Sequence, residues 1–268
     1  MNFGGGIDRN IDDDFGGDTG GDIGRDIAWE AYGWERLAHG VGRRRLPGWD
    51  ATCGLVAGRN GALLYDTGST LAEGEELRAR AEALLGGRPV THIALSHPHF
   101  DHVLGTAAFP GAEVFGAAGV AALLSGEGRE ALRADAVRFG VDEEEAARSA
   151  RALVAPEHAV AGELVVDLGG RRVVLVELGP AHTGHDLAAL VPGGRGEPDV
   201  VFCGDLVEES GEPQAGPDAV GARWPTALDR LLALGGPDAV YVPGHGAVVD
   251  AGFVRAQRAV LADRFGVS

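Results

Sequence analysis

Short apolar runs, separated by glycine and polar turns, begin near Trp29 and continue almost to the end of the chain. Residues 54–68 hold two such runs around Arg59-Asn60-Gly61, and Asn-Gly between apolar runs favours two strands joined by a tight turn. Residues 70–87 then show helical spacing, with Ser69 or Thr70 available as the N-cap and glycines at the end. The pattern next predicts a strand at 91–96, the start of a helix at 101–109 and a strand at 113–117.

The second half of the chain continues this alternation of strands and helices without a repeat of fixed length. Residues 117–152 are rich in Ala, Leu, Glu and Arg at helical spacing. Short apolar strands follow, separated by Gly and Pro, at 163–168, 171–178, 186–191, 199–204 and 239–244. Helices are expected at 225–234 and at 252–265. The chain thus has two successive series of strands with helices inserted between them. This order indicates an α/β domain whose helices lie outside packed sheets.

The first 27 residues differ in composition from the rest. They are mainly Gly and Asp with little to bury, so we expect a disordered tail at 1–27 and one folded domain at 28–268. A translation start placed too far upstream is an alternative origin for this tail. Its adjacent Asp12, Asp13 and Asp14 do not alternate as in a calcium loop, so we expect no calcium site.

Composition narrows the class of protein. The formal net charge of −17 disfavours a nucleic-acid partner, because such a surface repels phosphates. The chain has no apolar run of about 18 residues that would span a membrane, and its N-terminus lacks the pattern of a secretory signal. Its two cysteines, Cys53 and Cys203, suit a reducing compartment. We therefore expect a cytoplasmic protein with a small-molecule substrate, whose oligomeric state the sequence does not indicate.

Four potential metal ligands crowd into SHPHFDH at residues 96–102. The chain has nine histidines in 268 residues, and three of them lie in this stretch beside an aspartate. At a strand end, residues i and i+2 point the same way, so His97 and His99 can converge on one ion. Asp101 and His102 follow as the chain turns into a helix, and they can face the same cavity from another side. One ion rarely needs all four from one loop, so the spacing favours two adjacent ions.

Three later residues complete a possible ligand set. His182, Asp205 and His245 each follow an apolar strand. Side chains at strand ends are well held, as a metal site requires. Each residue alone has an ordinary explanation, since Asp205 can cap a helix and His245 can occupy a turn. Their shared position after buried strands favours one common site with the 96–102 loop.

The ordered set SHPHFDH, AHTGHD, CGDL and PGHG, preceded by YDTGS at 65–69, resembles the metallo-β-lactamase superfamily of metallohydrolases. The similarity covers residues 36–262. It implies an α/β (α+β) fold, a four-layer αβ/βα sandwich with two mixed β-sheets face to face, helices outside and a dinuclear site at one edge. It also implies His97, His99 and His182 at the first metal, Asp101, His102 and His245 at the second, and Asp205 as the bridge between them.

This resemblance implies a metal-dependent hydrolase. Two Zn²⁺ per chain are the expected cofactors, with Fe or Mn as alternatives. A bound metal lowers the pKa of water from about 16 to about 7, and the hydroxide can then attack a small ester, thioester, lactone or lactam carbonyl. Asp101 is the expected catalytic residue, because it can orient this hydroxide. Two alternatives stay open: a mononuclear iron dioxygenase acting on persulfide-type sulfur compounds, and a non-catalytic metal-binding regulatory module.

Further residues are candidates for supporting the site. Asp66 either braces a ligand loop through hydrogen bonds or caps a turn. His185 either contacts substrate or lies behind the ligands or at the surface. Arg223 and Trp224 are pocket candidates. The helical segment 117–152 either shapes the substrate pocket or only completes the outer layer, and we favour the pocket because inserted segments often carry specificity.

Overall fold

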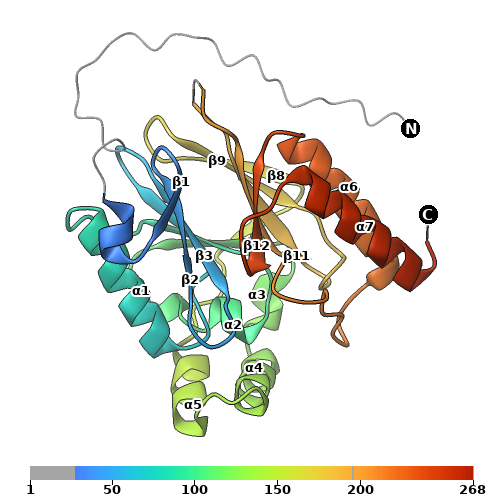
Figure 1. The fold of residues 1–268 in the computed structure, drawn as a ribbon. Coiled ribbons are helices and arrows are strands. Elements are labelled where there is room, and N and C mark those ends of the chain that lie inside the picture. Colours follow the sequence, from blue (N-terminus) through green and yellow to red (C-terminus); the bar gives the residue numbers. More distant parts are fainter. Residues whose placement is uncertain (1–27, 195, 268) are drawn as a thin grey trace.

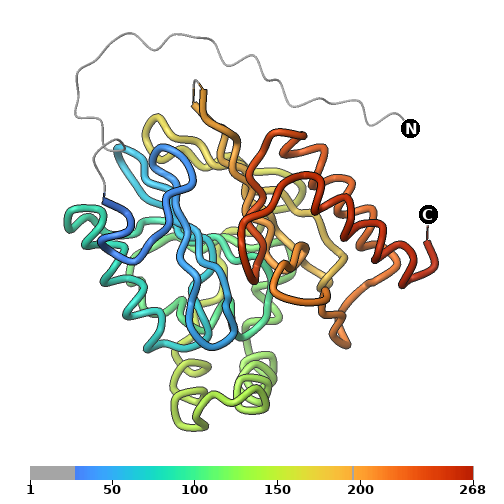
Figure 2. Tube along the Cα trace, in the orientation of Figure 1, coloured from blue at the N-terminus to red at the C-terminus, as the bar shows by residue number. Residues whose placement is uncertain are grey.

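The strands form two sheets that face each other, with helices on both outer sides (Figure 1). The structure is a computed structural model that describes residues 28–194 and 196–267, so the tail expected at 1–27 lies outside the described residues. The four-layer α/β sandwich predicted from the sequence is confirmed. Figure 2 shows how the sequence divides between the layers: the blue-to-green part of the chain builds one side and the yellow-to-red part the other.

Both sheets are mixed. The first sheet has seven strands in chain order, antiparallel from β1 to β4 and parallel from β4 to β7. They are β1 (Glu35–Ala38), β2 (Val41–Arg45), β3 (Thr52–Ala57), β4 (Ala62–Tyr65), β5 (His92–Leu95), β6 (Glu113–Ala117) and β7 (His158–Val160). The second sheet has the order β12-β11-β10-β9-β8, and only its β11–β12 pair is parallel. Its strands are β8 (Glu163–Asp167), β9 (Arg172–Glu177), β10 (Leu187–Val191), β11 (Val200–Glu208) and β12 (Val240–His245).

Helices cover the outer faces of the two sheets. Buried side chains of α1 pack with the core of the first sheet, and those of α6 and α7 pack against the second. The helices are α1 (Leu71–Leu84), α2 (Phe100–Val103), α3 (Val120–Leu123), α4 (Glu127–Arg138), α5 (Glu143–Ala152), α6 (Trp224–Gly235) and α7 (Ala251–Phe265), with 3₁₀ turns η1 (Trp29–Tyr32), η2 (Thr106–Ala108) and η3 (Gly221–Arg223). None of the described helices combines the length and hydropathy that a membrane span needs.

The first hairpin and first helix follow their local sequence signals. β3 and β4 pair antiparallel with Ala57 opposite Ala62, as the Asn-Gly turn predicts. The α1 helix begins after Thr70, whose hydroxyl accepts a hydrogen bond from the Glu73 N–H at 3.1 Å. The Glu73 carboxylate in turn accepts from the Ser69 N–H at 2.8 Å. These reciprocal bonds satisfy two backbone donors at the helix start, so Thr70 is the cap and Ser69 supports it.

The interface between the sheets is tightly packed around two aromatic rings. Tyr65 from β4 and Phe202 from β11 stack with their centroids 5.4 Å apart, and both are almost fully buried. The Tyr65 hydroxyl donates to the Leu187 carbonyl of β10 at 2.6 Å, which joins the sheets by a polar contact. Gly54 leaves the space for this pair, because a Cβ there would lie 2.4 Å from the Phe202 ring. The packing thereby fixes how the strand ends of one sheet meet those of the other.

The hydrophobic pattern does not predict β1, β2 or β7. The β2 strand ends in three consecutive arginines, a composition typical of exposed segments. Arg43 is nevertheless buried, because it donates to the Gly246 carbonyl at 2.8 Å and forms an ion pair with Glu35 at 2.7 Å. The β7 strand has only three residues, too few to show alternation. Tertiary partners therefore stabilise strands that local hydrophobicity does not reveal.

Two helical predictions need correction in detail. The segment at 117–152 forms three helices, because Gly126 and Gly140 take φ angles of 53° and 102° between them. The helix expected at 101–109 ends after one turn, at Val103. Gly105 then packs so closely on the 66–68 turn that a Cβ would lie 2.0 Å from the Thr67 carbonyl oxygen. This close contact turns the chain toward η2.

Candidate metal centre

The seven predicted ligands come from the ends of strands in both sheets. The loop after β5 carries His97 and His99, and the one-turn helix α2 carries Asp101 and His102. The second sheet contributes His182 after β9, Asp205 within β11 and His245 as the last residue of β12. Because the two sheets face each other, these ends meet at one edge of the sandwich. The structure thus brings together residues up to 148 positions apart, from His97 to His245.

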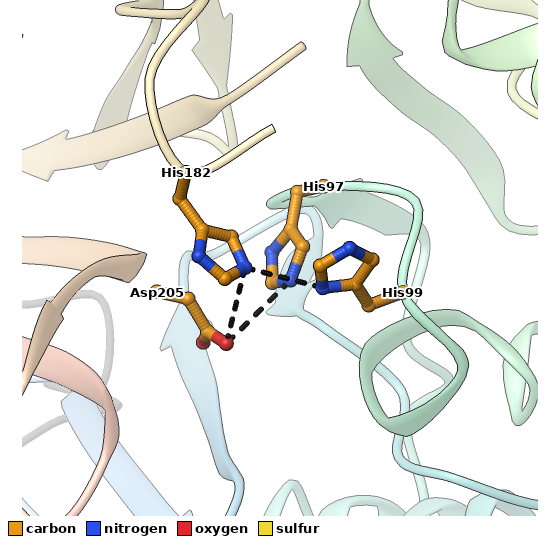
Figure 3. Close-up of side chains that lie close together, drawn as sticks. All are labelled: His97, His99, His182 and Asp205. Carbon is orange, nitrogen blue, oxygen red and sulfur yellow. Dashed lines mark hydrogen bonds and ion pairs between the residues drawn. The ribbon is translucent and has the colours of Figure 1, made fainter. Parts of the chain in front are cut away.

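The seven side chains fall into two adjoining groups. His97, His99, His182 and Asp205 place one potential ligand atom each within 4.8 Å of one another, and Asp101, His102 and His245 do the same. We call these the first and the second group. Figure 3 shows the three rings of the first group turned toward the Asp205 carboxylate. Each group offers the imidazole and carboxylate ligands that Zn²⁺ and similar ions bind.

Asp205 lies between the two groups. Its Oδ2 atom is 3.7 Å from His97 Nε2 and 3.5 Å from His182 Nε2 in the first group. The same oxygen is 3.4 Å from His245 Nε2, while Oδ1 is 3.2 Å from His102 Nε2 in the second group. One carboxylate thus contacts rings of both groups, as the resemblance implied for a bridging ligand.

Four of the rings are held from behind through Nδ1, which leaves Nε2 facing the centre. His102 Nδ1 lies 2.9 Å from Asp66 Oδ2, and His97 Nδ1 lies 2.8 Å from the Ser96 hydroxyl. His182 Nδ1–H and His245 Nδ1–H donate to main-chain carbonyls, of Gln214 at 3.0 Å and of Trp49 at 2.7 Å. Such outer contacts orient metal-binding histidines and select their tautomer.

The inner atoms are the ones that a cation would satisfy. Among the described residues, His97 Nε2, His102 Nε2 and Asp205 Oδ1 are buried without a properly oriented hydrogen bond, although the last two lie only 3.2 Å apart. A buried polar atom left unpaired costs about 1–3 kcal/mol, so three together in one place call for a partner. The residues present therefore fit a bound metal.

His99 is oriented the other way round. Its Nδ1 faces inward, 3.1 Å from His182 Nε2, and its Nε2 faces outward, 3.0 Å from Asp218 Oδ2. Asp218 is a site residue that the sequence pattern does not reveal. It lies in a Gly- and Pro-containing loop, 119 residues from His99, and no spacing links the two.

Without metal, the electrostatics of the two groups differ. Burial lowers the pKa of His97 well below its usual value and lowers the pKa of His182 to about 4, so both rings are neutral. Burial also acts on His102 and His245, but Asp205 and Asp101 outweigh it and raise both pKa values, that of His245 to about 11. Burial raises the pKa of Asp205, but His102, His245 and His97 outweigh it and bring that pKa well below its usual value. Neutral imidazole and ionised carboxylate are the forms that bind metal, so a metal entering the second group displaces protons from its rings.

Asp66 and His185 take different places around the centre. Asp66 is buried, and besides contacting His102 it accepts a hydrogen bond from the Ser96 N–H at 2.7 Å. The backbone of Asp66 has a φ angle of 63° in the turn after β4, and its side chain contacts the ring of His102. His185 is half-buried and packs over Gly119, where a Cβ would lie 2.5 Å from the imidazole ring. Neither residue belongs to the two groups.

Trp224 and Arg223 do not lie in an open pocket beside the metal groups. Trp224 is fully buried; its ring packs edge-on at 5.3 Å from the ring of His182, and its Nε1–H donates to the Leu206 carbonyl at 3.0 Å. It therefore supports His182 from behind. Arg223 is exposed and lines a separate cavity of about 290 Å³ with Pro180 and Arg230.

The helical segment reaches the ligand loop through aromatic rings. Phe139, at the end of α4, stacks on Phe100 with centroids 5.7 Å apart. Trp49 meets the same Phe100 ring edge-on at 5.4 Å. Phe100 lies between the ligands His99 and Asp101, and Phe139 is 56% exposed. A row of three aromatic rings thus connects the ligand loop to the surface.

Comparisons with known proteins agree with this architecture. Residues 46–245 match the sequence model of a family described as the metallo-beta-lactamase superfamily. A metallo-beta-lactamase from Pontibacter korlensis aligns with a TM-score of 0.64 at 21% identity, covering 86% of this chain and 98% of that one. The metallo-beta-lactamase FIM-1 from Pseudomonas aeruginosa, in its mono-zinc form, aligns with a TM-score of 0.59 at 19% identity, covering 87% and 95%. A metallo-beta-lactamase from Hirschia baltica also has a TM-score of 0.59, at 16% identity, covering 85% and 96%.

These identities establish a shared fold and no shared substrate. A search of curated proteins gave no significant match.

Proposed function

Because the chain belongs to the metallo-β-lactamase superfamily, we propose that it is a metal-dependent hydrolase of a small ester, thioester, lactone or lactam. The observation that carries this proposal is the pair of adjoining ligand groups, in which His97 Nε2, His102 Nε2 and Asp205 Oδ1 are buried without a hydrogen-bond partner. A purely structural cluster would pair these atoms within the protein. A regulatory metal-binding module is less well supported, because the Asp101 carboxylate stays partly open to solvent.

We propose two Zn²⁺ ions per chain, with Fe or Mn as alternatives that imidazole and carboxylate ligands also accept. The contacts of Asp205 with rings of both groups support a bridging role. The mono-zinc form of the FIM-1 structure shows that a protein of this fold can hold a single zinc ion. Occupancy of the two groups therefore has to be measured separately. The proposed ligands are His97, His99 and His182 at the first metal, Asp101, His102 and His245 at the second, and Asp205 at both.

When bound, the metal ions supply the chemistry that makes a nucleophile from water near neutral pH and that polarises a carbonyl group. The protein contributes a proton acceptor and fixed geometry. Asp101 Oδ2 lies 3.3 Å from His245 Nε2 and 3.5 Å from His102 Nε2. Its side chain is 13% exposed, against 7% for Asp205, so Asp101 is the carboxylate that a water molecule and a substrate reach more easily.

We propose that Asp101 accepts a hydrogen bond from the attacking water and takes up its proton as the water oxygen bonds to the carbonyl carbon. The bond between that carbon and the leaving group then breaks, and the proton passes to the leaving alcohol, thiol or amine. Burial raises the pKa of Asp101, but His102 and His245 lower it below its usual value. The carboxylate is therefore ionised at neutral pH and can accept the hydrogen bond that orients the attacking water.

The partner and the location are proposals as well. We propose a small-molecule substrate rather than a nucleic acid, because the net charge of −17 repels a phosphate backbone. Both cysteines are free and buried, which supports the proposed cytoplasmic location.

The test is a hydrolase screen on protein of known metal content. Activated thioesters, esters, lactones and β-lactams serve as substrates, RNA serves as the nucleic-acid arm, and His97→Ala serves as the site control. We expect turnover of at least one carbonyl substrate, lost in His97→Ala and in chelated protein. A fully loaded protein that hydrolyses none of them would refute the proposal. Oxygen uptake with a persulfide would favour the iron dioxygenase, and robust RNA cleavage would refute the small-molecule substrate.

A further inference from the structure

One loop holds two of the three histidines of the first group. This loop, residues 209–220, connects β11 to η3. Its Gln214 carbonyl accepts the hydrogen bond from His182 Nδ1–H at 3.0 Å, and its Asp218 carboxylate lies 3.0 Å from His99 Nε2. The two rings thus held meet edge-on, with His182 Nε2 3.1 Å from His99 Nδ1, the contact drawn as a dashed line in Figure 3.

The loop is itself fixed at three points. The Gln214 N–H donates to the buried carboxylate of Glu208 at 3.0 Å. Arg264, in the last turn of α7, donates to the Pro213 carbonyl at 2.7 Å. The Val220 N–H donates to the Ala181 carbonyl at 2.8 Å, next to His182 in sequence. Gln214 and Asp218 are therefore presented by an anchored segment.

The rings of the second group are held from outside this loop. Asp66, in the turn after β4, holds His102, and the Trp49 carbonyl holds His245. The start of the loop meets this group through the main chain, where the Glu209 N–H donates to the His245 carbonyl at 3.0 Å. Gln214 and Asp218, further along the loop, contact rings of the first group.

His99 needs its outer partner more than the other rings do. A neutral imidazole carries one N–H, and only the other nitrogen can bind a metal. His99 presents Nδ1 inward, the reverse of the other four rings, so its N–H must sit on Nε2. A carboxylate acceptor at Nε2 stabilises that tautomer and fixes the ring plane.

We propose that Asp218 is a positioning residue that holds His99 in its ligating tautomer, and that this contact sets the metal affinity of the first group. The inference rests on the metal binding proposed above and does not depend on the substrate. Asp218 would accordingly tune the metal occupancy of the first group.

The test measures metal affinity in a background with one intact group. His245→Ala removes a ligand of the second group, so competition with a graded chelator then reports mainly the first group. Adding Asp218→Ala should weaken zinc binding about 10- to 100-fold, the usual effect of removing an outer partner. Asp218→Asn keeps an acceptor oxygen, so it should recover part of the lost affinity. Asp229→Asn is the matched control and should change nothing, because Asp229 is an exposed aspartate on α6 that pairs with Arg258 of α7.

A second readout follows the ring itself. In the zinc-loaded protein, ¹⁵N shifts of the His99 ring should show the N–H on Nε2 in the wild type and a mixture of tautomers in Asp218→Ala. A variant with wild-type affinity and an unchanged tautomer would overturn the inference while leaving the proposed function intact. A wild-type protein that binds no metal would overturn both, so the two failures are distinguishable.

Discussion

At the scale of single residues, the chemistry of the candidate metal centre depends on which side chains are ionised and which are fixed by hydrogen bonds. Asp101 and Asp205 are both carboxylates of the centre, but they differ in surroundings. Asp205 touches rings of both groups, whereas the ion pairs of Asp101 within the described part of the chain are with His102 and His245. Substitutions at Asp101 should therefore lower metal binding by the second group and the rate of the reaction, with little effect on metal binding by the first group.

Replacing Asp101 by Asn should lower turnover by at least about a hundredfold, the scale expected when a positioned proton acceptor or charge is removed. Asn keeps the size but loses the negative charge that helps to neutralise the second ion. We expect the variant to retain most first-group metal and to lose much of the second. Elemental analysis beside turnover on the best screened substrate measures both. Wild-type activity in a variant shown to hold one metal would contradict the two-metal mechanism.

A pH effect is expected from Asp186, which lies behind the ligand loop of His182. Burial raises the pKa of Asp186 to about 7, although Thr183 donates two hydrogen bonds to its Oδ1 atom. The folded protein therefore holds a proton that the unfolded chain, with its ordinary pKa of 3.8, has lost between these pH values. The contribution of this group to stability is complete below pH 3.8 and is lost as the pH rises to about 7.

Asp186→Asn should remove this dependence, because Asn is neutral throughout and keeps an acceptor for Thr183. The free energy of unfolding, measured in denaturant at pH 5 and at pH 8 with metal content matched, should fall less in the variant than in the wild type. An equal fall in both proteins would show that Asp186 is already ionised when folded. Asp229→Asn again serves as the control for loss of a surface charge.

At the scale of secondary-structure elements, the three helices of 120–152 are joined to the ligand loop by the row Trp49, Phe100 and Phe139. The ring of Phe139 at the end of this row is 56% exposed, so a substrate can reach it. That this segment shapes the substrate pocket stays a prediction. The row of rings identifies Phe139 as the residue at which to test it.

Phe139→Ala should raise the KM for substrates with long apolar acyl groups about three- to tenfold and leave acetyl substrates nearly unchanged. Stacking between aromatic rings and an apolar group contributes about 0.5–1.5 kcal/mol, which corresponds to this range. Leu123→Ala is the control, because Leu123 is also exposed on the same segment but is not one of the three rings of the row. A uniform change across chain lengths would favour the purely structural role.

At the scale of the whole molecule, the candidate metal centre lies where the two sheets meet. The loop after β5 supplies potential ligands from the first sheet, and β11 and β12 supply potential ligands from the second. Metal ions held at this position would link the two halves of the sandwich. Ions that bind the folded but not the unfolded chain add stability that grows with their affinity.

Removing the metal with a chelator should lower the melting temperature by about 10 °C. A ligand at a thousand times its Kd adds about 4 kcal/mol, and in a chain of this size each kcal/mol shifts the midpoint by about 2–4 °C. Calorimetry of loaded and chelated protein measures the shift, and adding Zn²⁺ should reverse it. An unchanged midpoint in protein confirmed to lose metal would mean that the sheets are held together by their apolar interface alone.

The sequence by itself determined the elements whose signals are local. The Asn-Gly turn, the Thr70 cap and the apolar runs of β10 and β11 predict their structures because a turn, a cap or a buried strand depends on neighbouring residues. The seven potential ligands were also predictable, because each lies in a short motif in or just after an apolar strand, although β11 continues past Asp205 to Glu208.

Only the tertiary structure decided the contacts between distant segments. The β2 strand keeps Arg43 buried because Gly246, far along the chain, accepts its hydrogen bond. Asp218 and the carbonyls of Gln214 and Trp49 orient three ligand rings, yet carbonyls carry no residue-type signal and Asp218 has no fixed spacing to His99. Hydrophobic periodicity records which face of an element is buried, whereas the atom that meets a given ring nitrogen depends on how the two sheets pack.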